Sequence, residues 1–106
     1  MFVILLTYTQ PLAEVDKLIP AHREFLQRMY DSGRFLLSGR KEPRTGGVIL
    51  ASAASMEALK RLLADDPYSV HGVADYQIIE FTPTMSAPCC QRWASRCARV
   101  IIARCR

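Results

Sequence analysis

The sequence predicts an α+β domain of the ferredoxin-like class, with the element order βαββαβ, over residues 1–84. Three observations lead to this prediction. The chain has 106 residues, which suits a single domain. Half of its residues are apolar and 23% are charged, as in globular proteins. Along the chain, the two-residue period of strands and the three-to-four-residue period of helices follow each other in this order.

A strand and a helix open the pattern. Residues 2–9 are rich in β-branched and aromatic side chains, which favours a largely buried strand. Apolar side chains then recur at helical spacing over residues 13–30, until Gly33 ends the helix. Pro20 lies inside this stretch and indicates either a kink or a regular helix that begins there.

A hairpin, a second helix and a last strand complete the pattern. Residues 34–40 and 47–53 are strand-like and flank a polar loop, as in a β-hairpin. Ser55 is a good N-cap for a second amphipathic helix, which ends near residues 65–67. Residues 73–81 then form the last strand.

This topology puts both helices on one face of a four-stranded antiparallel sheet and leaves the other face open. Alternating apolar residues predict that part of the open face is apolar, and they are Val48, Leu50, Ile78 and Phe81. A homodimer that packs sheet against sheet, as in a dimeric α/β barrel, would cover this face.

The positive charge of the chain lies in a C-terminal extension, residues 85–106. The net charge is +4, but residues 1–84 carry nine basic and ten acidic side chains, whereas the extension carries five arginines and no acid. The domain therefore does not favour a nucleic-acid partner. In the extension, the arginines are spread among apolar residues, so it is either a partner-contacting helix or strand, or an incidental appendage.

The extension also holds all the cysteines, which are Cys89, Cys90, Cys97 and Cys105. The domain thus needs no disulfide, which favours a cytoplasmic protein. The cysteine spacings do not match those of zinc sites, so no metal is predicted. Phosphate-binding loops and the marked hydrolase motifs are missing from the sequence, and no cofactor is predicted. The apolar N-terminus is too short to span a bilayer, so no membrane partner is predicted.

His22 is the first candidate for chemistry. It shares the core-facing stripe of the first helix, and a polar imidazole there requires a hydrogen-bonding partner. The topology brings the start of this helix, the end of the second strand at Ser38-Gly39 and the end of the second helix at Asp66 to one end of the domain. Asp66 is thus the carboxylate best placed to orient His22 as a general acid or base.

A structural role for Asp66 stands beside the catalytic one. Asp before Pro is a common N-cap of a short helical turn, and a buried His bonded to Asp can serve stability alone. His71 is expected to be an exposed loop residue. Other side chains are predicted to offer polar contacts to a small ligand, and they are Tyr8, Tyr30, Tyr68, Arg23 and Arg40.

Four segments of the chain resemble the YciI-like (YCII-related) family. They are MFVILLTY at 1–8, PAHREFL at 20–26, LSG at 37–39 and DPY at 66–68, the last followed by Gly72. The resemblance implies a dimeric ferredoxin-like domain with a His–Asp dyad on His22 and Asp66 and with Ser38 and Gly39 at its edge. One enzyme of this family eliminates chloride from chlorinated aromatics, so the resemblance predicts a site better than a substrate.

Together these observations predict a small-molecule site with His22 and Asp66 as catalytic dyad. Ser38, Gly39, Tyr68 and Tyr8 are predicted to bind the substrate. A dyad without a nucleophile suits lyase or isomerase chemistry on a small polar metabolite, such as one that bears a carboxylate. The alternative is a non-catalytic module that senses a metabolite or contacts another protein.

Overall fold

The computed structural model describes residues 1–93 of the chain. Its elements, in chain order, are β1 (Phe2–Tyr8), α1 (Leu12–Asp16), α2 (Ile19–Asp31), β2 (Phe35–Arg40), β3 (Gly46–Ala51), α3 (Met56–Leu63), α4 (Pro67–Val70), β4 (Ala74–Glu80) and the 3₁₀ helix η1 (Pro88–Trp93). Among these described residues, no helix has the length and apolar character needed to cross a membrane.

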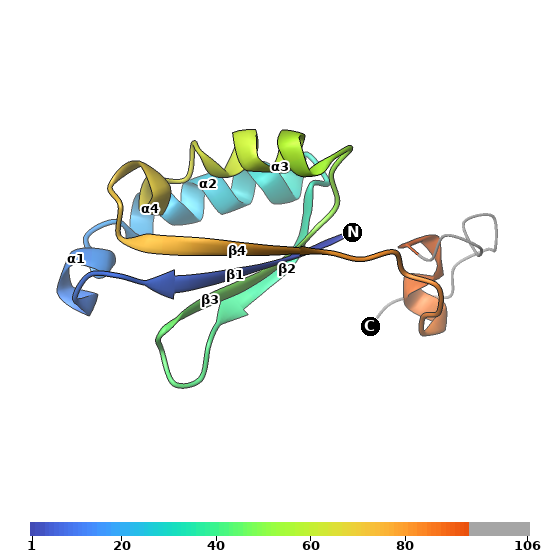
Figure 1. Ribbon diagram of the computed structural model, residues 1–106, viewed down its shortest axis with the longest axis horizontal. Coiled ribbons are helices and arrows are strands. Elements are labelled where there is room, and N and C mark those ends of the chain that lie inside the picture. Colours follow the sequence, from blue (N-terminus) through green and yellow to red (C-terminus); the bar gives the residue numbers. More distant parts are fainter. Residues whose placement is uncertain (94–106) are drawn as a thin grey trace.

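The four strands form one antiparallel sheet in the order β2-β3-β1-β4. Helices α2, α3 and α4 lie on one side of it (Figure 1). The predicted α+β ferredoxin-like class is therefore confirmed. The end of β1, the start of α2 and the short helix α4 meet at one end of the sheet, and the chain leaves β4 at the other end.

The predicted first helix is two helices in the structure. Helix α1 ends at Asp16, and α2 begins at Ile19 with Pro20 in its first turn. Proline suits that turn because its missing N–H has no helical partner there. Of the two interpretations of Pro20, the helix that begins there is correct. Gly33, with φ of +76°, ends α2 in the left-handed conformation that favours glycine.

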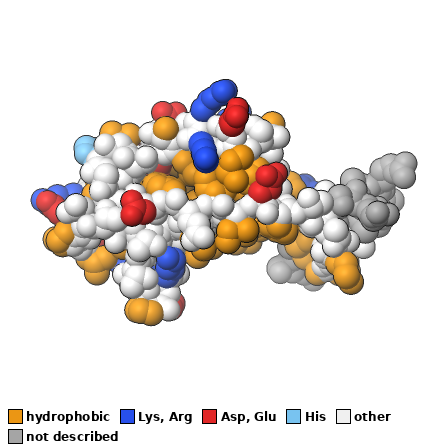
Figure 2. All heavy atoms as spheres, viewed as in Figure 1, with side chains coloured by type: hydrophobic (Ala, Val, Ile, Leu, Met, Phe, Trp, Pro, Cys, Tyr) orange, Lys and Arg blue, Asp and Glu red, His pale blue; other side chains and the backbone are white. Residues whose placement is uncertain are grey.

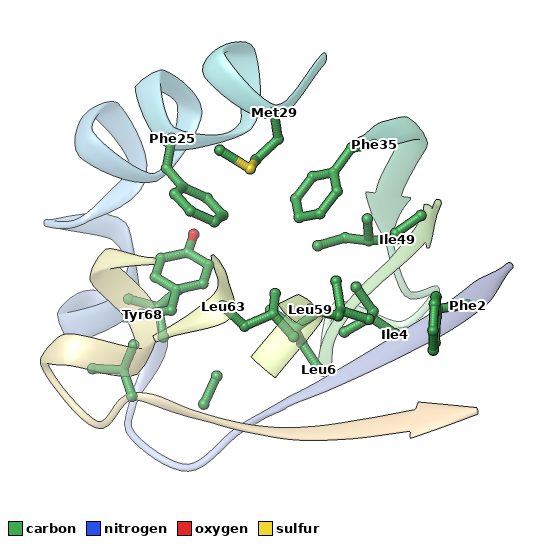
Figure 3. Packing of buried hydrophobic residues seen from close by; sticks show 14 residues of the cluster. Phe2, Ile4, Leu6, Phe25, Met29, Phe35, Ile49, Leu59, Leu63 and Tyr68 are labelled. Atoms are coloured by element: carbon green, nitrogen blue, oxygen red, sulfur yellow. The ribbon is translucent and has the colours of Figure 1, made fainter. Parts of the chain in front are cut away.

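The hydrophobic core lies between the helices and the sheet. In Figure 3, Phe25 and Met29 point from α2 toward Phe35 and Ile49 of the sheet. The rings of Phe25 and Phe35 meet edge to face with centroids 5.9 Å apart. Leu59, fully buried on α3, packs into the same cluster. This packing fixes α2, and with it His22, relative to the strands.

The opposite face of the sheet carries no helix and is partly apolar. The pairs Val3–Leu50 and Leu5–Val48 of neighbouring strands lie on it. Hydrophobic side chains gather along this side of the sheet in Figure 2. The assignment of Ile78 to this face is wrong. It pairs with the fully buried Ile4 and packs against the core, because directly opposite residues share a face.

The first part of the extension lies near the end of the sheet that is remote from α1 (Figure 1). Side chains of η1, among them Trp93, line an apolar hollow of about 640 Å³ together with Leu37, Leu50 and Phe81. Several residues for which a partner-contacting helix or strand was predicted lie outside the described residues. They are Arg96, Cys97, Arg99, Val100, Ile101, Ile102, Arg104, Cys105 and Arg106.

Candidate functional site

The segment Asp66-Pro67-Tyr68 builds one wall of the site. Asp66 is the N-cap of α4, and its Oδ1 accepts a hydrogen bond from the backbone N–H of Tyr68 at 3.1 Å. Pro67 occupies the first helical position, where its fixed φ suits the helix. A proline-started turn with an aspartate cap thus holds the carboxylate in one orientation.

Asp66 also binds His22 across the domain. The Nδ1 of His22 donates to Oδ1 of Asp66 at 2.7 Å. One carboxylate oxygen of Asp66 therefore both caps α4 and binds His22, the two roles that the sequence predicts for this residue. The second oxygen, Oδ2, accepts a hydrogen bond from the hydroxyl of Tyr76 at 2.6 Å.

The three hydrogen bonds from His22, Tyr68 and Tyr76 compensate for the complete burial of the Asp66 carboxylate. Asp66 is 0% exposed, and burying a charge without partners is costly. Hydrogen bonds to an ionised group are also shorter and stronger than those between neutral groups. Asp66 is thus fixed by α2, α4 and β4 at once, which makes it a rigid support for the His22 ring.

The ring of His22 is held on its face as well as at its edge. It stacks on the ring of Tyr68 with centroids 3.8 Å apart and planes 9° from parallel. Its side chain is 13% exposed, and it lines a cavity of about 630 Å³. Because Nδ1 donates to Asp66, the neutral ring carries its lone pair on Nε2.

The other predicted binding residues line the same cavity. Tyr8, at the end of β1, lies edge-on to Tyr68 with centroids 6.0 Å apart. Ser38 and Gly39, on β2, form another part of the wall. The hydroxyls of Ser38 and Tyr30 are hydrogen-bonded to each other. The fold therefore brings Tyr8, Ser38, Gly39 and Tyr68 to the cavity that His22 lines, whereas Tyr30, also predicted to contact a ligand, is not among its lining residues.

Burial sets the protonation of two tyrosines around Asp66. It raises the pKa of the Tyr76 hydroxyl well above its ordinary value, and the neighbouring carboxylate of Asp66 adds to this rise. Burial likewise raises the pKa of Tyr68, and Tyr8 adds to the effect. Both hydroxyls stay protonated at neutral pH, so Tyr76 is a permanent donor to Asp66.

Tyr76 was not predicted from the sequence, although a signal for it exists. In β4 the buried Ala74 is followed two residues later by Tyr76, whereas Asp75 and Gln77 lie on the other face. That alternation identifies Tyr76 as a core-facing residue at the end of the sheet where α4 lies. His71 is exposed, as expected for a loop residue.

The solved structures with the same fold include two enzymes. The first is 5-chloro-2-hydroxyhydroquinone dehydrochlorinase from Burkholderia phenoliruptrix AC1100, in complex with 2,5-dihydroxybenzoquinone. The TM-score is 0.66 at 15% sequence identity, over 78% of this chain and 95% of that chain. The second is muconolactone isomerase, with a TM-score of 0.66 and 20% identity, over 81% of this chain and 92% of that chain.

At these identities the two likenesses show the fold. No curated protein matches the chain in a sequence comparison. The family model of the YCII-related domain, however, matches residues 1–82, which hold the whole sheet, helices α1 to α4 and every residue of the site described above. This chain therefore belongs to the YCII-related domain family.

Proposed function

We propose that this chain is an enzyme that moves a proton on a small organic substrate, in a lyase or isomerase reaction. His22 is the general base and acid, and Asp66 orients it. Tyr8, Ser38 and Gly39 contact the substrate, and Tyr68 supports the imidazole by stacking. The predicted substrate is a small polar metabolite, such as one that bears a carboxylate.

The observation that carries this proposal is the triple hydrogen bonding of Asp66. A carboxylate with 0% exposure holds Nδ1 of His22 at 2.7 Å, while the ring lines a cavity of about 630 Å³. A general base needs a fixed tautomer and access to the substrate, and the arrangement supplies both. Stacking on Tyr68 further limits rotation of the ring.

The chemistry follows from this arrangement. Nε2 of His22 takes a proton from a carbon of the substrate, and the C–H bonding electrons stay on the substrate as a conjugated anion. Asp66 stabilises the imidazolium that forms. In an isomerase, the same proton returns to a different carbon. In a lyase, a leaving group departs with its bonding electrons, and the imidazolium gives up its proton afterwards.

The names of the two enzymes with the same fold agree with this chemistry. One is a dehydrochlorinase and the other an isomerase. Reactions of both types consist of proton removal with elimination or proton return, and a single acid-base residue can perform them. We infer the reaction class for this chain from its own dyad, and these names support it.

A proton-exchange experiment tests the proposal without a known product. Small carboxylates with an acidic C–H bond, each incubated with the protein in D₂O, are followed by NMR for loss of the C–H signal. We expect at least one to exchange, and His22→Gln to slow this exchange by about a hundredfold or more. His71→Gln, which changes the exposed histidine, is the matched control and keeps the wild-type rate.

Two results would contradict the proposed enzymatic function. In the first, His22→Gln exchanges as fast as the wild type. In the second, carboxylates bind in the cavity but none exchanges, which would favour the metabolite-sensing module. Binding is measured on the same samples from changes in ligand linewidth, so the two results are distinct.

We infer further that two copies of the chain pair through the open face of the sheet. The support is the set of apolar cross-strand pairs on that face, Val3 with Leu50 and Leu5 with Val48. A domain that ends near residue 84, a separate extension and a cytoplasmic location are predictions from the sequence alone.

A further inference from the structure

Three arginines line the cavity, and two of them are engaged by carboxylates. Arg44 donates to Asp16, and this hydrogen bond raises the pKa of the guanidinium. Arg40 donates through Nε to Glu42 at 2.8 Å. The one acidic residue of the described lining, Asp16, is thus already paired.

Arg23 differs from these two arginines. It follows His22 on α2 and lines the same cavity, but none of residues 1–93 forms a hydrogen bond or ion pair with its guanidinium. Helix α2 begins nearby without an acidic side chain in its first turn and without a side-chain cap. The positive end of the helix dipole therefore adds to the positive potential around Arg23.

Part of the cavity wall is apolar, beside polar lining residues such as Tyr8 and Ser38. Leu6 and Ile49 of the sheet and Ile19 and Leu26 of the helical layer line the cavity. A wall that combines these apolar side chains with one unpaired guanidinium suits a ligand with an apolar body and one anionic group. A guanidinium also matches the planar, two-oxygen geometry of a carboxylate better than an ammonium does.

We propose that Arg23 is the anion-binding residue of this cavity and that its ligands are small organic carboxylates with an apolar body. The inference deepens the proposed function and rests on it for the identity of the ligand site. It assigns the binding of the anionic group to Arg23, which lines the same cavity as the acid-base residue His22. It also predicts that neutral analogues bind weakly.

Benzoate and benzamide form a matched pair of probes, because they differ in charge but hardly in shape. Binding to the wild-type protein is measured by NMR titration of backbone amides. We expect benzoate to bind about tenfold more tightly than benzamide. Arg23→Gln should remove this preference and leave benzamide binding unchanged, and Arg23→Lys should restore part of it. Arg61→Gln, on the exposed side of α3, is the control and keeps the preference.

Three results would overturn the inference. They are absence of benzoate binding to the wild type, equal affinity for the two probes, and a preference that survives in Arg23→Gln. The experiment is independent of turnover. In His22→Gln the preference for benzoate should persist. If the wild-type protein exchanges no substrate proton but prefers benzoate, the proposed enzyme is refuted and the anion site stands. If the wild-type protein exchanges a substrate proton but shows no preference for benzoate over benzamide, the anion site is refuted and the proposed enzyme stands.

Discussion

The imidazole of His22 lies flat on the ring of Tyr68, with centroids 3.8 Å apart and planes 9° from parallel. Tyr68 is only two residues after Asp66, which holds the edge of the same imidazole. One short segment, Asp66-Pro67-Tyr68, therefore fixes His22 in two directions. The stability of this segment and the geometry of the site therefore depend on the same atoms.

Asp66→Ala should destabilise the domain strongly. The substitution removes the acceptor of three hydrogen bonds and the N-cap of α4, and it leaves buried donors unpaired. We expect the free energy of unfolding to fall by about 3 kcal/mol. Urea denaturation measures it. The neighbouring Asp65 is exposed, and Asp65→Ala should change stability by less than about 0.5 kcal/mol. Equal effects of the two substitutions would contradict the described role of Asp66.

Tyr76 should make the domain sensitive to alkaline pH. Its pKa in the folded state is raised above the ordinary value of 10.0, mainly by burial. The protonated form is thus favoured by folding, so the stabilisation is complete below the unfolded-state pKa and is lost as pH rises above it. We expect the urea midpoint to fall as pH increases beyond about 10.

The variant Tyr76→Phe separates this effect from general alkaline unfolding. It loses the hydrogen bond to Asp66, so it should be less stable by about 1–2 kcal/mol at neutral pH, but its alkaline decline should be shallower. Tyr30→Phe, which keeps Tyr68 and Tyr76, should decline as steeply as the wild type. A Tyr76→Phe protein with the wild-type slope would refute the prediction.

Gly46 allows β3 to approach β1 closely. A Cβ atom at this position would lie 1.8 Å from the carbonyl oxygen of Leu6, whereas a Cβ at Gly39 would meet nothing within 4 Å. We expect Gly46→Ala to cost about 3 kcal/mol or more, because backbone must move to relieve the clash. Gly39→Ala, also at the cavity wall, should fold as well as the wild type. Thermal unfolding followed by circular dichroism compares the two, and equal midpoints would contradict this packing.

The open face of the sheet predicts a dimer. Leu5 lies at its centre, between Val48 on β3 and Gln77 on β4. Leu5→Glu would place two like charges in a sheet-to-sheet interface, so we expect it to convert the dimer to a monomer that remains folded. Val70→Glu, on α4, should remain a dimer. Sedimentation equilibrium measures the mass. A monomeric wild type, or a dimeric Leu5→Glu, would contradict this interface.

The element order and the neighbours of His22 could be predicted because they follow from periodicity and chain direction. The apolar stripe of α2 placed His22 toward the core, and the antiparallel order brought the ends of β2 and α3 to the same end of the sheet. These rules need only the position of each residue in its element. They identified Asp66 as the partner of His22 without knowledge of any distance.

Other features depend on exact register and three-dimensional packing. In β4, Ile78 pairs with Ile4 on the core face, and the next residue, Ile79, pairs with Val3 on the open face. Because both are isoleucines, their hydropathy does not decide which of them faces the core. The same register brings Tyr76 to Asp66. The ion pair of Arg44 with Asp16 depends on how the loop between β2 and β3 lies against the end of α1, which the order of the elements does not fix.

The tautomer of His22 decides whether its Nε2 can accept a proton from a substrate. Long-range ¹H–¹⁵N correlation NMR at about pH 9, where an ordinary histidine is neutral, assigns the proton to one ring nitrogen. We expect a proton on Nδ1, bonded to Asp66, and a lone pair on Nε2. His71, which has no such partner among residues 1–93, is the internal reference. In Asp66→Asn the fixed preference should weaken. A proton on Nε2 of His22 in the wild-type protein would contradict the proposed acid-base dyad.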